Sequence, residues 1–114
     1  MTALYRVDFE VSNNEDFRYA FQLADEAGVP VNLAGAQFRM DVEDRAGADV
    51  ISFSTANGRI IIDAAAGRID LIAPVIEIAI LRENYHTQDM LMTMSGQTTR
   101  LWVGGFTIIQ GVTE

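Results

Sequence analysis

The stretch Tyr5-Arg6-Val7-Asp8-Phe9-Glu10-Val11 alternates apolar and charged side chains without interruption. Successive side chains of an extended chain point to opposite faces, so the apolar residues share one face and the charged residues the other. This pattern predicts a half-buried β-strand from Leu4 to Val11. The same period of two recurs at residues 17–23 and 38–42, which makes sheet the dominant expected structure.

Turn residues divide the middle of the chain into shorter segments. Strands are expected at residues 50–54, 59–63 and 68–72, and Asn57-Gly58 is a strong hairpin signal between the first two. The stretch from Pro74 to Leu81 is the one helical candidate, because proline suits the first turn of a helix. Its isoleucines also recur at every second position, so a strand is the alternative there.

Two longer strands are expected to close the fold. Residues 85–95 carry apolar side chains on both faces, which leaves the register of this strand open. Residues 99–109 are rich in β-forming residues and are interrupted by Gly104-Gly105. A bulge at these glycines would turn four apolar side chains inward, namely Leu101, Val103, Phe106 and Ile108.

Together these segments predict an all-β fold in a single domain, residues 1–114. About seven or eight short antiparallel strands, with at most one short helix, are typical of a two-sheet sandwich. A chain of 114 residues with 49% hydrophobic residues can bury such a core without disulfides, and it has no cysteine. The expected core consists of Val7, Phe9, Phe17, Tyr19, Phe21, Leu23, Phe38, Met40, Ile60, Ile69 and Phe106.

The charge balance argues against several classes of partner. Sixteen acidic residues against eight basic ones give a formal net charge of -8. This sign opposes binding to phosphate backbones, so nucleic acid is not an expected partner. No apolar run approaches the ~20 residues that cross a bilayer, and no secretory signal sequence is recognisable. We therefore expect no membrane insertion and no export by the general secretory route.

Few residues suggest catalysis or metal binding. His86 is the sole histidine, and without cysteine or a G-x-S-x-G motif it is expected to be a surface residue of a strand. Four acids that flank one turn could hold calcium, but a solvated acidic rim explains them better. These acids are Asp41, Glu43, Asp44 and Asp49.

A carboxylate pair is the remaining catalytic candidate. Asp63 and Asp70 could face each other across a hairpin, as the paired acids of glycosidases do. The sequence gives no sign of an aromatic cleft around them, so this interpretation is weak, and an ordinary role as aspartates that flank turns explains them. We therefore expect no enzyme activity, and no catalytic residue, metal or cofactor.

The last two expected strands carry more apolar side chains than one buried face requires. If Leu101 and Val103 point inward, Trp102 points outward, and an exposed indole marks an interface. The candidate interface residues are Trp102, Ile109, Leu91 and Met92. An open edge strand offers a second route to a partner. The alternatives are a monomer whose patch is covered, and a carbohydrate- or host-surface-binding module in which Trp102 contacts the glycan.

Three stretches follow a recognisable order along the chain. Residues 17–36 end in Asp-Glu-Ala-Gly-Val-Pro-Val-Asn-Leu-Ala-Gly-Ala, close to a pattern D-x-x-G-x-P-V-D-L-T-G-A. Residues 58–60 and 66–71 are similar to a hairpin pattern G-x-I-x-I... G-x-I-x-L. Residues 89–93 and 101–108 are similar to the two strands that close the same pattern. This order resembles a family of tailed-bacteriophage and prophage proteins related to the N-terminal domain of the phage baseplate upper protein.

The resemblance covers nearly the whole chain from Phe17 onward, and it implies an immunoglobulin-like β-sandwich. It also implies a structural or adaptor component of a phage or prophage tail or baseplate that acts through protein–protein assembly. The partners would be other phage tail proteins or a second copy of the chain. The location would be the virion tail, after synthesis in the host cytoplasm.

Overall fold

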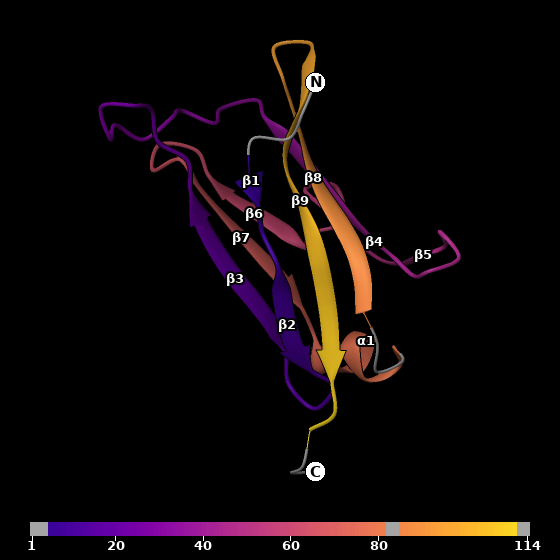
Figure 1. Ribbon diagram of the computed structural model, residues 1–114. Helices are drawn as coiled ribbons and strands as arrows, with labels where there is room; N and C mark the ends of the chain where they lie inside the picture. Colours follow the sequence, from indigo (N-terminus) through magenta and orange to yellow (C-terminus); the bar gives the residue numbers. More distant parts are fainter. Residues whose placement is uncertain (1–4, 82–84, 112–114) are drawn as a thin grey trace.

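The computed structural model describes residues 5–81 and 85–111, and these contain nine strands and one short helix in two sheets (Figure 1). The strands are β1 (Tyr5–Arg6), β2 (Phe9–Ser12), β3 (Phe17–Gln22), β4 (Gln37–Glu43), β5 (Asp49–Ser54), β6 (Ile60–Asp63), β7 (Arg68–Ala73), β8 (Tyr85–Met94) and β9 (Gln97–Ile109). The helix is α1 (Val75–Ala79). The prediction of an all-β fold with at most one short helix is confirmed for the described residues, with more strands than expected.

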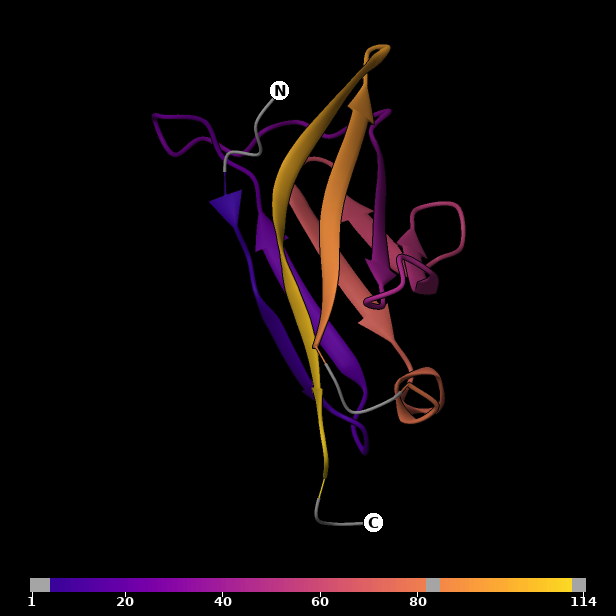
Figure 2. The same cartoon turned by 45° about the vertical axis from the view of Figure 1, so that its right-hand side comes forward.

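The larger sheet has the order β1-β9-β8-β4-β5, and β2 continues the line of β1 along β9 (Figure 2). Its central pairs are antiparallel, but β1 and β2 run parallel to β9. The prediction of an entirely antiparallel fold is therefore wrong at this edge. Alternation fixes the face of each side chain but leaves the direction of the neighbouring strand open. The strand predicted from Leu4 to Val11 is also divided at Val7 and Asp8, and Leu4 lies outside the described residues.

The smaller sheet consists of β3, β7 and β6 in that order, all antiparallel. Helix α1 follows β7 directly and lies at one end of the two sheets, beside the start of β8 (Figure 1). It begins after Pro74, as the sequence predicts, and it buries Ile78. The ion pair between Arg59 and Glu77 joins the first turn of this helix to the residue that precedes β6.

The core lies between the two sheets and is rich in aromatic rings. Phe9 of the larger sheet packs edge-on against Phe17 of the smaller one, with ring centroids 5.4 Å apart. Among the expected core residues, those that are buried are Phe9, Phe17, Phe38, Met40, Ile60, Ile69 and Phe106, and those that are partly buried are Val7, Phe21 and Leu23. Tyr19 is the exception, because its side chain is 47% exposed on edge strand β3.

The bulge in β9 lies at Leu101 instead of at the predicted glycines. Met90 is paired with Trp102 and Leu91 with Arg100, so Leu101 is the extra residue. Beyond it the strand is regular, and inward positions fall on Trp102, Phe106 and Ile108. The glycines serve another purpose. A Cβ on Gly104 would overlap the carbonyl group of Val7, so glycine lets the N-terminal strand approach β9 closely.

Candidate interaction surfaces

The four residues predicted to form one interface lie on two different faces of the larger sheet. Trp102 and Met92 point into the core side, where Trp102 is buried and Met92 half-buried. Leu91 is half-buried on the outer face, and Ile109 is exposed there. The expectation of an exposed Trp102 is therefore wrong, because the bulge lies one residue before it and sets the opposite alternation. The strands are neighbours as expected, but these residues form no single apolar patch.

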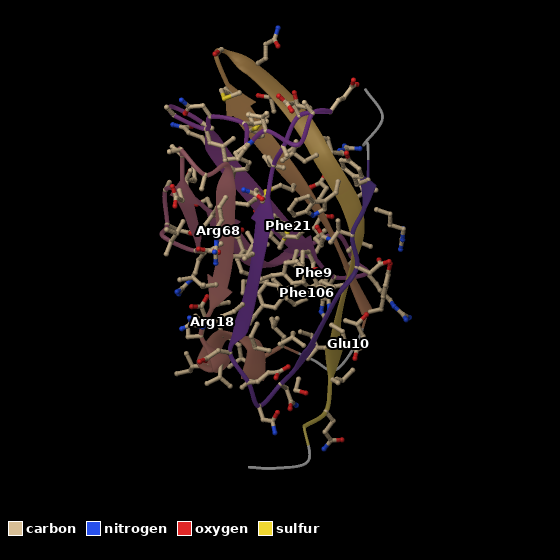
Figure 3. All side chains as sticks on the ribbon, turned by 90° about the vertical axis from the view of Figure 1, so that its left-hand side faces the viewer. Phe9, Glu10, Arg18, Phe21, Arg68 and Phe106 are labelled. Carbon is tan, nitrogen blue, oxygen red and sulfur yellow. The ribbon has the colours of Figure 1, made fainter. Side chains whose placement is uncertain are left out.

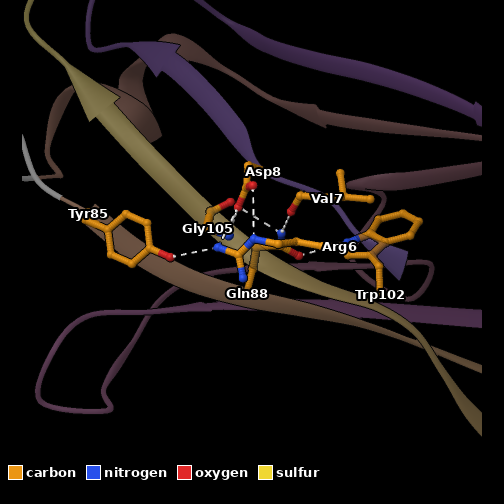
Figure 4. A network of polar contacts seen from close by, with 7 residues as sticks. All are labelled: Arg6, Val7, Asp8, Tyr85, Gln88, Trp102 and Gly105. Carbon is orange, nitrogen blue, oxygen red and sulfur yellow. Dashed lines mark hydrogen bonds and ion pairs between the residues drawn. The ribbon is translucent and has the colours of Figure 1, made fainter. Parts of the chain in front are cut away.

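The indole of Trp102 belongs to a buried polar network that the sequence analysis missed (Figure 4). Its Nε1–H donates to Oε1 of Gln88 at 2.8 Å. The side-chain amide of Gln88 donates in turn to the carbonyl oxygens of Val7 at 2.7 Å and Gly105 at 3.3 Å. A glutamine at an inward strand position was the available signal, since a buried amide needs partners. The network joins β8, β9 and the N-terminal strand.

A second part of the network is exposed and joins the same three strands, β8, β9 and the N-terminal strand. The backbone N–H of Gly105 donates to Oδ1 of Asp8 at 2.8 Å, and Arg6 Nε donates to Oδ2 of Asp8 at 3.2 Å. Arg6 also reaches the hydroxyl oxygen of Tyr85 at 3.5 Å. The Gly105 N–H, and secondarily Arg6, hold the pKa of Asp8 below its usual value, while burial opposes them. Hydrogen bonds to Tyr85 and Asp8 raise the pKa of Arg6.

The outer face of the larger sheet carries an open groove of about 780 Å³. It runs over β4, β5, β8 and β9, and the residues that line it include Arg39, Ser52, Leu91, Thr93 and Thr98. Leu91 lies directly between Arg39 of β4 and Arg100 of β9. An apolar residue with cationic neighbours on both sides, in an open groove, suits a protein partner with an apolar anchor and acidic surroundings.

The charges along this face are largely paired with each other. Arg39 contacts Asp41 at 3.0 Å, and Ser52 Oγ donates to the same carboxylate at 2.8 Å. Arg100 contacts Asp89 at 3.3 Å. Asp41, Asp89 and Arg100 border a second hollow of about 310 Å³ on the same face. Exposed pairs of this kind contribute little stability and are easily exchanged for a partner's charges.

The acidic residues that the sequence offered for calcium have other contacts. Asp41 is paired with Arg39, and Asp44 accepts the N–H groups of Ala46 and Ala48 within its turn. Glu43, at the end of β4, is paired with Asp49, at the start of β5. In the described part of the chain, no three histidine, aspartate or glutamate side chains are grouped as a metal site.

The other titratable candidates also lie differently from the expectation. Asp63 is paired with Arg68, and Asp70 with Ile61, so the two aspartates are not directly opposite each other. His86 is buried instead of exposed, and its Nδ1 lies 3.3 Å from the carbonyl oxygen of Phe106. Its position on the inward face of β8 follows from the alternation that also buries Gln88 and Met90.

The arrangement is that of an all-β domain with two packed sheets, the larger of which is extended at one edge by a parallel N-terminal strand. Among solved structures it is similar to the N-terminal domain of phage TP901-1 ORF48, with a TM-score of 0.56 and 12% sequence identity. The similarity covers 90% of this chain and 84% of that chain. No protein-family model and no curated protein matches the sequence. Within residues 5–81 and 85–111, no helix is long and apolar enough to span a membrane.

Proposed function

We propose that this chain is a structural or adaptor component of a bacteriophage or prophage tail or baseplate, and that it acts through protein–protein contacts. The observation that supports this most is the similarity in fold to a phage protein domain over 90% of the chain. The order of the sequence patterns at residues 17–36, 58–71 and 89–108, which resembles that of phage tail proteins, supports the same proposal. The immunoglobulin-like character of the sandwich and a location in the virion tail are part of this proposal.

The outer face of the larger sheet is the docking surface that we propose for another tail protein. It combines a groove, an apolar residue at Leu91 and exchangeable ion pairs at Arg39 and Arg100. Shape, an apolar centre and a polar rim are the common features of protein interfaces. In this proposal the chain is not an enzyme and needs no cofactor, because its charged side chains serve recognition and folding.

The carbohydrate-binding alternative loses the residue on which it depended. Trp102 is 3% exposed and its indole N–H is bonded to Gln88, so its ring offers no free face for a sugar. Its ring also packs against Phe21, with centroids 4.4 Å apart. We therefore retain protein–protein assembly as the proposed function.

Mass spectrometry of purified particles tests this proposal. Virions induced from a host that encodes the chain should contain it, and it should stay with tails when these are separated from capsids. Detection in the lysate but not in the particles would contradict a virion role.

A pair of variants tests the proposed docking face. Leu91→Glu removes the apolar centre of the groove and places a carboxylate between two arginines, so the fold should be retained. It should reduce incorporation into particles. Ile76→Glu is the matched control, because Ile76 is 72% exposed on α1, away from the groove. If both variants were incorporated equally, the outer face of the larger sheet would be excluded as the docking surface. A role in the tail through another surface would then remain.

A further inference from the structure

β3 is an outer strand of the smaller sheet, and its Phe21 lies beside Phe9 and Phe106 of the larger sheet (Figure 3). Tyr19 lies on the inner face of β3, on the same side as Phe17 and Phe21, yet it is 47% exposed. Its ring packs 4.6 Å from Phe21 and 5.2 Å from Phe9 by ring centroids, so it lies at the border of the core. Inward aromatic side chains with this exposure indicate room for one more strand beside β3.

Within residues 5–81 and 85–111, β3 is paired with β7 on one side only, so its other backbone edge is unpaired there. The N–H of Leu23 donates to the carbonyl oxygen of Gly67 at 2.7 Å and so continues the pairing of β3 with β7. On the opposite side of β7, the N–H of Ile72 donates to the carbonyl oxygen of Arg59 at 2.9 Å. Hydrogen-bonding positions alternate along a strand, so Tyr19 and Phe21 direct their backbone groups to β7. The backbone groups of three residues therefore point away from the sheet, at Arg18, Ala20 and Gln22.

We propose that this edge pairs with the same edge of a second copy of the chain, antiparallel, about a two-fold axis at Ala20. In this register Ala20 faces its own counterpart, and Arg18 faces Gln22 of the partner copy. The backbone groups of Arg18, Ala20 and Gln22 then form three hydrogen-bonded pairs with those of the partner copy. Each pair shares two hydrogen bonds, so the contact has about six. The two smaller sheets would become one continuous sheet across the dimer.

The side chains of β3 are complementary to themselves in this register. Tyr19 lies opposite Phe21 of the partner copy, and aromatic pairs stabilise neighbouring strands. Alanine at the axis is small enough for close approach, and no residue faces a like charge, because Arg18 faces glutamine. A two-fold contact needs such self-complementarity, and this is the reason to assign the edge to a second copy.

The net charge of the chain opposes the contact and gives it a recognisable salt dependence. Each copy carries a formal charge of -8, so two copies repel each other at low ionic strength. Salt screens such repulsion, with a Debye length of about 8 Å at physiological ionic strength. Dimerisation should therefore strengthen as salt is added, whereas a contact made by ion pairs would weaken.

Sedimentation velocity of the purified chain over a range of concentrations tests the proposal. The wild type should dimerise, and more tightly at higher salt. Ala20→Lys places two lysines opposite each other and should raise the dimer dissociation constant about tenfold or more. Ala20→Pro removes an N–H that β7 does not use, so it should give a folded monomer. Ala65→Lys, on the exposed turn before β7, is the control with the same charge change and should dimerise like the wild type.

Hydrogen exchange measured residue by residue identifies the edge. The amides of Arg18, Ala20 and Gln22 should exchange slowly in the dimer and fast in Ala20→Lys. A wild type that is monomeric up to millimolar concentration, or a dimer that Ala20→Lys leaves intact, would overturn the proposal. The inference does not rest on the phage assignment. The groove lies on the other sheet, so Leu91→Glu should leave the dimer unchanged.

Discussion

The carbonyl oxygen of Val7 accepts a hydrogen bond of 2.7 Å from the side-chain amide of Gln88, a residue 81 positions further along the chain. Val7 stands at the break between β1 and β2, where its N–H donates to the carbonyl oxygen of Val103 at 3.0 Å while its carbonyl oxygen turns to the Gln88 side chain. Gln88 therefore supplies a bond at this break, and its other end is held by Trp102. One buried amide thus fixes the parallel strand to the centre of the larger sheet.

Replacement of this amide should destabilise the fold. Gln88→Leu leaves the Val7 carbonyl and the Trp102 N–H without their partner, and each unsatisfied buried group costs about 1–3 kcal/mol. Urea unfolding followed by tryptophan fluorescence measures the change. Gln97→Leu, at the exposed start of β9, should change the free energy of unfolding by less than about 0.5 kcal/mol. Equal stability of the two variants would argue against the role of the network.

The two glycines of β9 should differ in their tolerance of alanine. A Cβ on Gly104 meets the backbone of Val7, which can move only if the N-terminal strand shifts. A Cβ on Gly105 meets the ring of Tyr85 at 2.5 Å, and because Tyr85 is 42% exposed its side chain can turn outward at the cost of its contact with Arg6. Gly104→Ala should therefore lower the melting temperature more than Gly105→Ala, by the equivalent of about 1–3 kcal/mol. The reverse order would show that the strand adapts more easily than the ring.

The exposed carboxylate of Asp8 should give the N-terminal edge a dependence on acid. The pKa of Asp8 is lowered in the folded state from its usual value of 3.8. The stability that the carboxylate contributes is therefore present above pH 3.8 and is lost as the pH falls through the lowered pKa. The stability difference between wild type and Asp8→Asn should accordingly be present at neutral pH and vanish in strong acid. Thermal unfolding of both proteins across this range measures it. A difference independent of pH would assign the effect to geometry instead of charge.

The sequence predicts the strands better than their arrangement, for physical reasons. Alternation is a local property, so the inward residues Phe9, Phe38 and Met40 are all predicted correctly. The parallel pairing of β2 with β9 and the bulge at Leu101 depend on contacts between distant segments. No local pattern encodes these contacts.

The errors at the candidate site follow from the misplaced bulge. A bulge moved by three residues reverses the face of every side chain between the two positions, and this turned Trp102 outward in the prediction. The polar network was missed for a different reason. Gln88 is ordinary in the sequence and gains its partners only when β8, β9 and the N-terminal strand are placed side by side.

Two inward-facing aromatic residues of β3 should respond very differently to truncation. Phe17 is 4% exposed and packs against Phe9, Phe53 and Phe106, so Phe17→Ala should cost about 3–5 kcal/mol through loss of burial and a cavity. Tyr19 is 47% exposed, and Tyr19→Ala should cost the monomer only about 1 kcal/mol, chiefly through its contacts with Phe9 and Phe21.

Urea unfolding at low protein concentration, where the monomer prevails, gives both values. The same Tyr19→Ala variant should weaken the dimer, because Tyr19 faces Phe21 of the partner copy in the proposed register. If Tyr19→Ala destabilised the monomer as much as Phe17→Ala does, Tyr19 would be a core residue of the monomer. If Tyr19→Ala dimerised like the wild type, the exposed ring of Tyr19 would have no part in the contact at the β3 edge.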